Sequence, residues 1–276
     1  GKWKSRVYLA RIDGFPLGMD YDGLSKWDMA LETGFIDGLV RKGLTVAEKL
    51  DHVKPRDPAE YISTSPENAF YMHGINLDDL DLIKNDMKAP ILLTYQIMDF
   101  SEDDLVVVIY LRMIELNTMK ILTSAMIKVG DPVSFLAQKE IDVYNEAFEI
   151  VKNIGDLPRA IFDRNVNLGL LNADILNISG NYKNTPSSKI MAIENGIITG
   201  LINNEKYKDN APVIMEKTKG FKLKFPSVYN SIVFNTSPLL YEDWEEFLKE
   251  TNCNVLMMYR HVPENGLYLK IIDIRD

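Results

Sequence analysis

The chain contains the same stretch of sequence twice, and this repeat constrains its fold more than any other feature. Residues 29–40 (MALETGFIDGLV) recur as residues 191–202 (MAIENGIITGLI), with seven of the twelve positions identical. Two further pairs of segments recur in the same order: residues 46–49 with 214–217, and residues 110–116 with 268–274. Ordered repetition of this kind indicates a tandem duplication of one folding unit.

Size and composition are compatible with two such units. A chain of 276 residues can hold two domains of about 100–150 residues, each with its own core. The formal charge of −9 argues against nucleic acid as a partner, because Lys and Arg must neutralise phosphates there. It also disfavours adhesion to anionic lipid. No apolar run approaches the ~20 residues that cross a bilayer, and the single cysteine, Cys253, excludes an intramolecular disulfide.

Each copy is predicted to fold as strand, helix, strand, helix and then further strands. In the first copy the apolar pattern predicts a strand at 7–12, a helix capped by Ser25 and stopped by Gly43, a strand at 44–48, a helix at 77–87, and strands at 91–98, 105–116 and 119–127. The second copy predicts a strand at 168–178, a helix from its cap Ser188 to residue 202, a strand at 213–217, a helix at 241–250, and strands at 254–261 and 266–274. Tyr95 of the first copy aligns with Tyr259 of the second.

The predicted fold class is therefore α/β (α+β), with two tandem three-layer domains of like topology joined by a helix at residues 133–154. The first domain is residues 1–132, the connecting segment 133–158, and the second domain 159–276. The second domain stops where the first has a turn and a last strand, so we expect it to lack that strand. Two alternatives follow: a truncation without a partner, or an open sheet edge through which the chain forms a homo-oligomer.

Both copies of the repeated helix carry two glycines four residues apart, Gly34 with Gly38 and Gly196 with Gly200. Such pairs occur in membrane helix dimers, but charged neighbours of the first pair argue against burial in lipid. Because glycine costs about 1 kcal/mol in a helix, we expect these glycines to allow close approach to a sheet. The expected inner face of the first helix is Trp27, Ala30, Leu31, Gly34, Gly38 and Leu39.

The histidines and acidic clusters give no reason to expect metal. His52, His73 and His261 have no neighbours at ligand spacing, and His261 is expected in a turn. The acidic clusters at residues 78–81 and 242–246 are expected to begin helices, where the helix dipole stabilises them without calcium.

No motif indicates covalent chemistry, and we predict no catalytic residue, no metal site and no cofactor. The recurring pairs Glu48-Lys49 and Glu216-Lys217 are interpreted as structural. Asp13-Gly14 and Asp22-Gly23 are interpreted as turns, although a ligand site at a strand end would also use such residues. The best binding candidates lie on two polar loops, where recognition often resides: Tyr61, Ser63, Tyr182 and Asn184.

Several phrases resemble one family of bacterial envelope proteins. Residues 12–15 (IDGF), Ala30-Leu31 and residues 46–49 (VAEK) are similar to the start of envelope lipoproteins of the CsgG, LpoB and FlgO type. Residues 111–124 (LRMIELNTMKILTS) resemble that family's later strand pair. Pro90 and Met119 depart from the family pattern, and the second copy matches more weakly.

The resemblance implies a fold like the amino-terminal domain of TolB, in two tandem copies. It also implies a non-catalytic lipoprotein that binds or assembles other proteins in the periplasm or at the cell surface. Such a protein would have an envelope protein as partner, no nucleic acid, and membrane contact only through an upstream lipid anchor. The alternative function is an enzyme or small-ligand sensor with its site in a cleft between the two domains.

Overall fold

The computed structural model describes residues 5–11, 21–47, 77–101, 106–130, 135–155, 166–172, 187–206, 212–216, 252–262 and 266–273. The loop residues Tyr61, Ser63, Tyr182 and Asn184 lie outside these ranges, as does the helix expected at residues 241–250. No helix in the described ranges is long and apolar enough to span a membrane.

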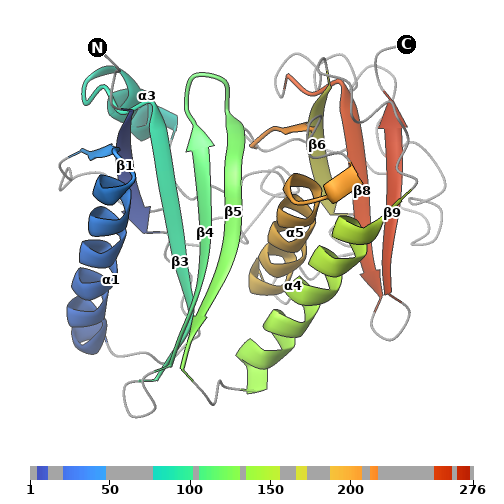
Figure 1. Cartoon of the computed structure of the whole chain (residues 1–276), viewed down its shortest axis with the longest axis horizontal. Coiled ribbons are helices and arrows are strands. Elements are labelled where there is room, and N and C mark those ends of the chain that lie inside the picture. The colour runs from blue at the N-terminus through green and yellow to red at the C-terminus, as the bar shows by residue number, and fades with distance from the viewer. Residues whose placement is uncertain are drawn as a thin grey trace.

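Two mixed sheets form the framework of the molecule (Figure 1). Sheet A has the order β2-β1-β3-β4-β5, with strands β1 (Arg6–Arg11), β2 (Thr45–Val46), β3 (Ile91–Ser101), β4 (Val106–Glu115) and β5 (Lys120–Val129). Sheet B has the order β7-β6-β8-β9, with strands β6 (Asn167–Asn172), β7 (Val213–Ile214), β8 (Val255–Val262) and β9 (Gly266–Asp273). In both sheets the first three strands are parallel and the later ones antiparallel.

The two sheets share not only their strand order but also their pairing register. Ile91 pairs with Glu115 in sheet A, and its counterpart Val255 pairs with Asp273 in sheet B. The residue three positions earlier has a left-handed backbone in both halves, with φ of 53° at Lys88 and 54° at Asn252. The predicted α/β fold with two halves of like topology is therefore confirmed. Among the described residues, sheet B has no counterpart of β5.

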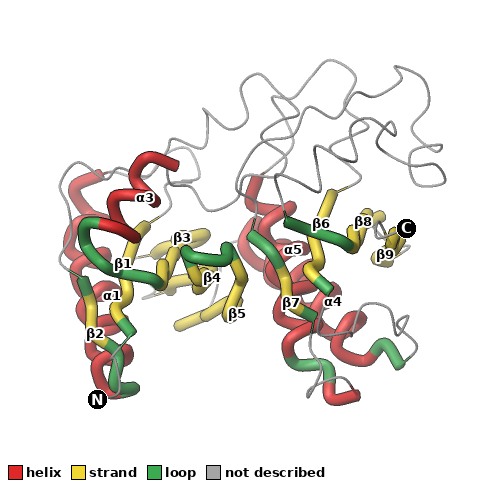
Figure 2. Tube along the Cα trace, turned by 90° about the horizontal axis from the view of Figure 1, so that it is seen from above, coloured by secondary structure: helices red, strands yellow, loops and turns green. Residues whose placement is uncertain are grey.

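Helices cover both faces of sheet A because side chains alternate across each strand. Leu9 and Leu93 face α1 (Tyr21–Arg41), whereas Tyr8 and Leu92 face α3 (Leu77–Asn85). α4 (Phe135–Asn153) is the predicted connecting helix, and it lies beside α5 (Ser187–Ile202) between the β4–β5 hairpin and sheet B (Figures 1 and 2).

The first helix starts earlier than its sequence predicts. α1 begins at Tyr21, so Ser25 is inside the helix rather than its cap, and Asp22-Gly23 is helical rather than a turn. One internal glycine costs only about 1 kcal/mol, which is too little to end a helix by itself.

α5 contributes to two apolar clusters. On one side its Ile193, Ile197 and Leu201 form a core with sheet B and α4. On another side Ala192 packs with Val108 and Tyr110 of β4. The second copy of the repeated helix is thus buried between elements of both halves, and this burial creates the site described next.

Candidate functional site

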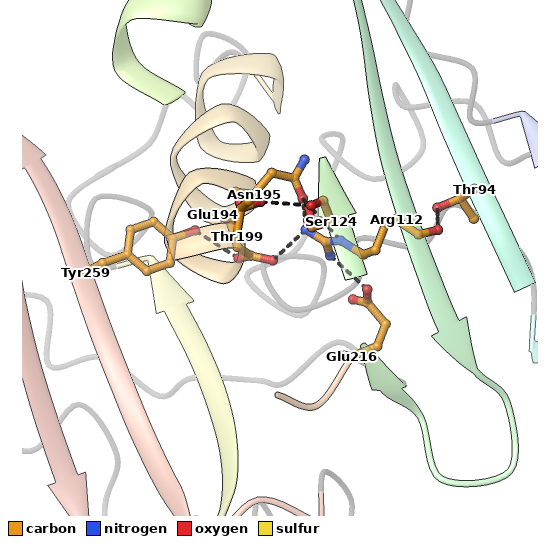
Figure 3. Close-up of polar contacts among 8 residues, drawn as sticks. All are labelled: Thr94, Arg112, Ser124, Glu194, Asn195, Thr199, Glu216 and Tyr259. Atoms are coloured by element: carbon orange, nitrogen blue, oxygen red, sulfur yellow. Dashed lines mark hydrogen bonds and ion pairs between the residues drawn. The ribbon is translucent and has the colours of Figure 1, made fainter. Parts of the chain in front are cut away.

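A buried charged cluster joins the two halves, and its centre is Arg112 on β4. Arg112 is only 4% exposed. Its Nη1 donates to Glu216 Oε2 at 2.8 Å, and its Nη2 lies 3.4 Å from Glu194 Oε1. Glu194 lies on α5, and Glu216 lies two residues beyond β7, so both carboxylates come from the second half (Figure 3).

Asn195 of α5 holds the guanidinium from a second direction. Its Oδ1 accepts from Arg112 Nη2 at 2.5 Å and from Arg112 Nε at 3.2 Å. The same oxygen accepts from Ser124 Oγ of β5 at 3.0 Å. On the far side of the cluster, Tyr259 of β8 donates its hydroxyl to Glu194 Oε2 at 2.9 Å. Donors and acceptors from four strands or helices therefore meet in one network.

The electrostatics of the cluster keep Arg112 charged. Burial by itself lowers the pKa of Arg112, but the carboxylates of Glu216 and Glu194 outweigh burial and raise this pKa above its ordinary value. Both carboxylates are themselves buried, each at 1% exposure. A buried charge is tolerated only when it is paired and hydrogen-bonded, and all three of these groups satisfy that condition.

Backbone contacts fix the position of Glu216. The amide of Glu216 donates to the Met119 carbonyl at 2.6 Å, in the turn between β4 and β5. Next to this bond, Lys120 and Met215 form an isolated antiparallel bridge. The β4–β5 hairpin of the first half therefore meets the end of β7 directly.

A second polar chain continues along α5 toward α4. The hydroxyl of Thr199 lies 2.7 Å from the Asn195 carbonyl of its own helix and 3.0 Å from the Ser124 carbonyl, so these two acceptors share its hydrogen, and it accepts from the Tyr144 hydroxyl at 3.2 Å. Burial raises the pKa of Tyr144, against the opposing hydrogen bond to Thr199. The junction is thus tied by side chains from α4, α5 and β5 as well as by Arg112.

The first half contains part of the same arrangement. Tyr95 donates to Glu32 Oε1 at 2.8 Å, as Tyr259 does to Glu194. Glu32 and Glu194 occupy the same position of the repeated helix. The tyrosine–glutamate pair therefore belongs to the folding unit itself, whereas the arginine contact exists between units.

For Glu216, the structure agrees with the structural interpretation of the recurring Glu-Lys pairs. Glu216 is buried and bound within the chain, which is a structural role. Glu48, Lys49 and Lys217 lie outside the described residues. Sequence reasoning missed Arg112 and Glu194, although an identical glutamate in both copies of a largely apolar helix was available as an indication.

The expectation for the glycine pair of α5 needs correction. A Cβ at Gly196 would lie 2.5 Å from the Tyr144 carbonyl, and one at Gly200 would lie 2.8 Å from the Phe148 carbonyl. Both carbonyls belong to α4, so these glycines admit a helix and not a sheet. The predicted close approach at these glycines is therefore present, but the element that approaches is the helix α4 and not a sheet.

The expected inner face of α1 is only partly correct. Leu39 is buried, and Leu31 packs with it against sheet A. Gly34 and Gly38 are exposed, and no atom of another described element lies within 4 Å of the position that a Cβ would take; Ala30 is exposed too. These three small residues therefore belong to the outer side of the helix.

His261 lies within β8, as the strand predicted at 254–261 implies, and not in a turn. It is 8% exposed, and its Nε2 is 3.0 Å from Glu146 Oε2 of α4. The strand continues to Val262, which pairs with Gly266 of β9. His52, His73 and Asp13 lie outside the described ranges. Within those ranges, no group of three or more His, Cys, Asp or Glu side chains could hold a metal ion.

Comparison with known proteins adds little to this geometry. No family model matches the chain, and no curated protein matches it. Among solved structures, the chain is similar to the lipoprotein GNA1162 from Neisseria meningitidis, with 15% sequence identity and a TM-score of 0.30. The match covers 55% of this chain and 99% of that one. This degree of similarity assigns neither a family nor a function.

Proposed function

We propose that the chain is a non-catalytic module of the bacterial envelope that binds or assembles proteins. The observation that carries the proposal is that the Arg112 cluster is bound within the chain. All three guanidinium nitrogens donate to side chains of the second half. A catalytic or ligand-binding arginine keeps donors directed at the substrate, whereas this one uses its donors to hold two halves together.

The position of the cluster bears on the alternative function. A small-ligand sensor or an enzyme of this architecture would use the space between its two halves. Here α5 and the Arg112 cluster occupy the junction between sheet A and sheet B, with apolar contacts beside them. The filled junction favours a rigid scaffold as the function, rather than a ligand-binding cleft.

The envelope location rests on the sequence resemblance to lipoproteins of the CsgG, LpoB and FlgO type. Such a protein would use loops and open sheet edges for its partners, including the loops that carry Tyr61, Ser63, Tyr182 and Asn184. A partner protein of the envelope, no enzyme activity and an upstream lipid anchor all belong to the proposal.

Site-specific photo-cross-linking in the producing cells tests this function. A photoreactive residue replaces Tyr61 or Tyr182 in the candidate loops, and Lys139, which is exposed on α4, serves as the matched control position. We expect adducts with an envelope protein from the loop positions and none from the control. In parallel, the purified chain is heated with a panel of metabolites, and we expect no rise in Tm. Absence of protein adducts, together with turnover or stabilisation by a metabolite, contradicts the proposal.

A further inference from the structure

The two copies of the repeated helix have opposite environments. In α5, Ala192, Asn195 and Thr199 form the face that meets β4 and β5. The same positions of α1 are Ala30, Thr33 and Asp37, here called the α1 face, and all three are exposed. Ile36 next to them is 41% exposed, whereas its counterpart Ile198 is fully buried. The α1 face is therefore the exposed counterpart of a surface that the chain covers once, with Ala30 identical and with Thr33 and Asp37 in place of Asn195 and Thr199.

Strand β9 is the counterpart of the strand that covers α5. Tyr110 and Arg112 of β4 correspond to Tyr268 and Lys270 of β9, here called the β9 face. Tyr110 is 2% exposed in the junction, whereas Tyr268 is 47% exposed. Lys270 keeps the positive charge that Arg112 uses in the internal contact, and it is partly exposed.

The charges on these two faces are complementary in the same way as in the internal junction. Arg112 approaches Glu194, which also accepts from Tyr259. On α1 the corresponding acid is Glu32, which accepts from Tyr95. An approaching Lys270 would meet Glu32 as Arg112 meets Glu194. α1 and β9 lie at opposite ends of the long axis of the molecule (Figure 1), so one chain cannot bring them together.

We propose that a second copy of this chain docks its β9 face on the α1 face, repeating between molecules the contact that β4 makes with α5 within one molecule. The inference rests on the proposed function, because it names a partner for an assembly module. Such a contact uses different surfaces on the two partners. Heterologous contacts of this kind build rings or filaments instead of stopping at a symmetric dimer.

Sedimentation velocity over a wide range of concentration tests the contact with two variants. Ala30→Trp places a large side chain on the exposed α1 face, and Lys270→Glu reverses the charge of the β9 face. Lys139→Glu, on the exposed surface of α4, is the matched charge control. Circular dichroism and thermal melting establish that each variant is folded.

We expect the wild-type chain and the control to form assemblies larger than dimers as the protein concentration rises. Each of the other variants should weaken self-association by about tenfold or more, since each places a like charge or a clash within the contact.

Mixing the two variants distinguishes a heterologous contact from other modes of association. Lys270→Glu retains an intact α1 face, and Ala30→Trp retains an intact β9 face. An equimolar mixture should therefore form a one-to-one dimer that does not grow further. A monomeric wild-type chain at every concentration overturns the inference, and so does a symmetric dimer that both variants retain. Either result leaves cross-linking to an envelope protein as an independent test of the proposed function.

Discussion

Arg112 shows how one side chain can join two folding units at high electrostatic cost. Moving a guanidinium and two carboxylates out of water carries a penalty of several kcal/mol per ion, which the mutual attraction offsets only with good geometry. The distances of 2.8 Å to Glu216 and 3.4 Å to Glu194, with Asn195 as a third partner, provide that geometry. The cluster therefore gives the junction specificity: a shifted docking of the halves would leave buried charges unpaired.

Removing the arginine should be far more damaging than removing an exposed one. Arg112→Ala leaves Glu194 and Glu216 buried without their cation, and we expect a loss of about 3–5 kcal/mol in the free energy of unfolding. Arg41→Ala is the control, because Arg41 pairs with Asp37 on the exposed surface of α1 and such pairs contribute about 0–1 kcal/mol. Urea titration followed by circular dichroism measures both. Equal effects of the two substitutions would show that the cluster does not stabilise the junction.

At the scale of single helices, the same sequence pattern has two structural outcomes. α1 and α5 both carry two glycines four residues apart. In α5 these glycines allow the backbone of α4 to approach closely, whereas in α1 no other part of the described chain occupies the corresponding space. The requirement for glycine therefore depends on the neighbouring helix and not on the helix that contains it.

Alanine substitution should change stability in opposite directions at the two equivalent positions. Gly34→Ala adds a good helix former where no atom lies within 4 Å of its Cβ, and we expect a gain of about 0.5–1 kcal/mol. Gly196→Ala forces its Cβ to 2.5 Å from the Tyr144 carbonyl, and we expect a loss of about 1–3 kcal/mol. Thermal and urea unfolding of the pair provide the comparison, and a stabilising Gly196→Ala would refute the close packing of α4 and α5.

At the scale of the whole molecule, the two halves share apolar core as well as charge. Ile121 of β5 belongs to the same cluster as Leu168 and Val255 of sheet B. Val108 and Tyr110 of β4 pack with Tyr144 of the connecting helix and Ala192 of the second half. The halves thus bury apolar surface against each other, and separating them exposes it to water.

This shared core predicts that both halves unfold together. Native-state hydrogen exchange in increasing urea should give the same opening free energy for the central amides of β3 and of β8. In Arg112→Ala the weakened junction should separate the two values, with the first half and the second half opening at different urea concentrations. Two separate transitions already in the wild-type chain would show that the halves are thermodynamically independent.

Local pattern alone was sufficient to predict most of the elements. The duplication follows from identical residues in the two copies. The order of elements along the chain and the connecting helix follow from apolar periodicity, which depends only on neighbouring residues. The strand order within each sheet and the matched registers came only from the structure. The start of α1 at Tyr21 was mispredicted, since a local cap signal was outweighed by continuous secondary structure.

The sequence by itself determined that two similar α/β units exist, because each unit encodes its own buried faces. Only the tertiary structure decided that Arg112 meets Glu194 and Glu216, residues that lie 82 and 104 positions away. It also decided that β4 and β5 cover one face of α5 whereas the equivalent face of α1 is exposed, although seven of twelve residues are identical in the repeated segment. The physical reason is that burial depends on which surfaces meet, and a repeated sequence carries the same surface into two different surroundings.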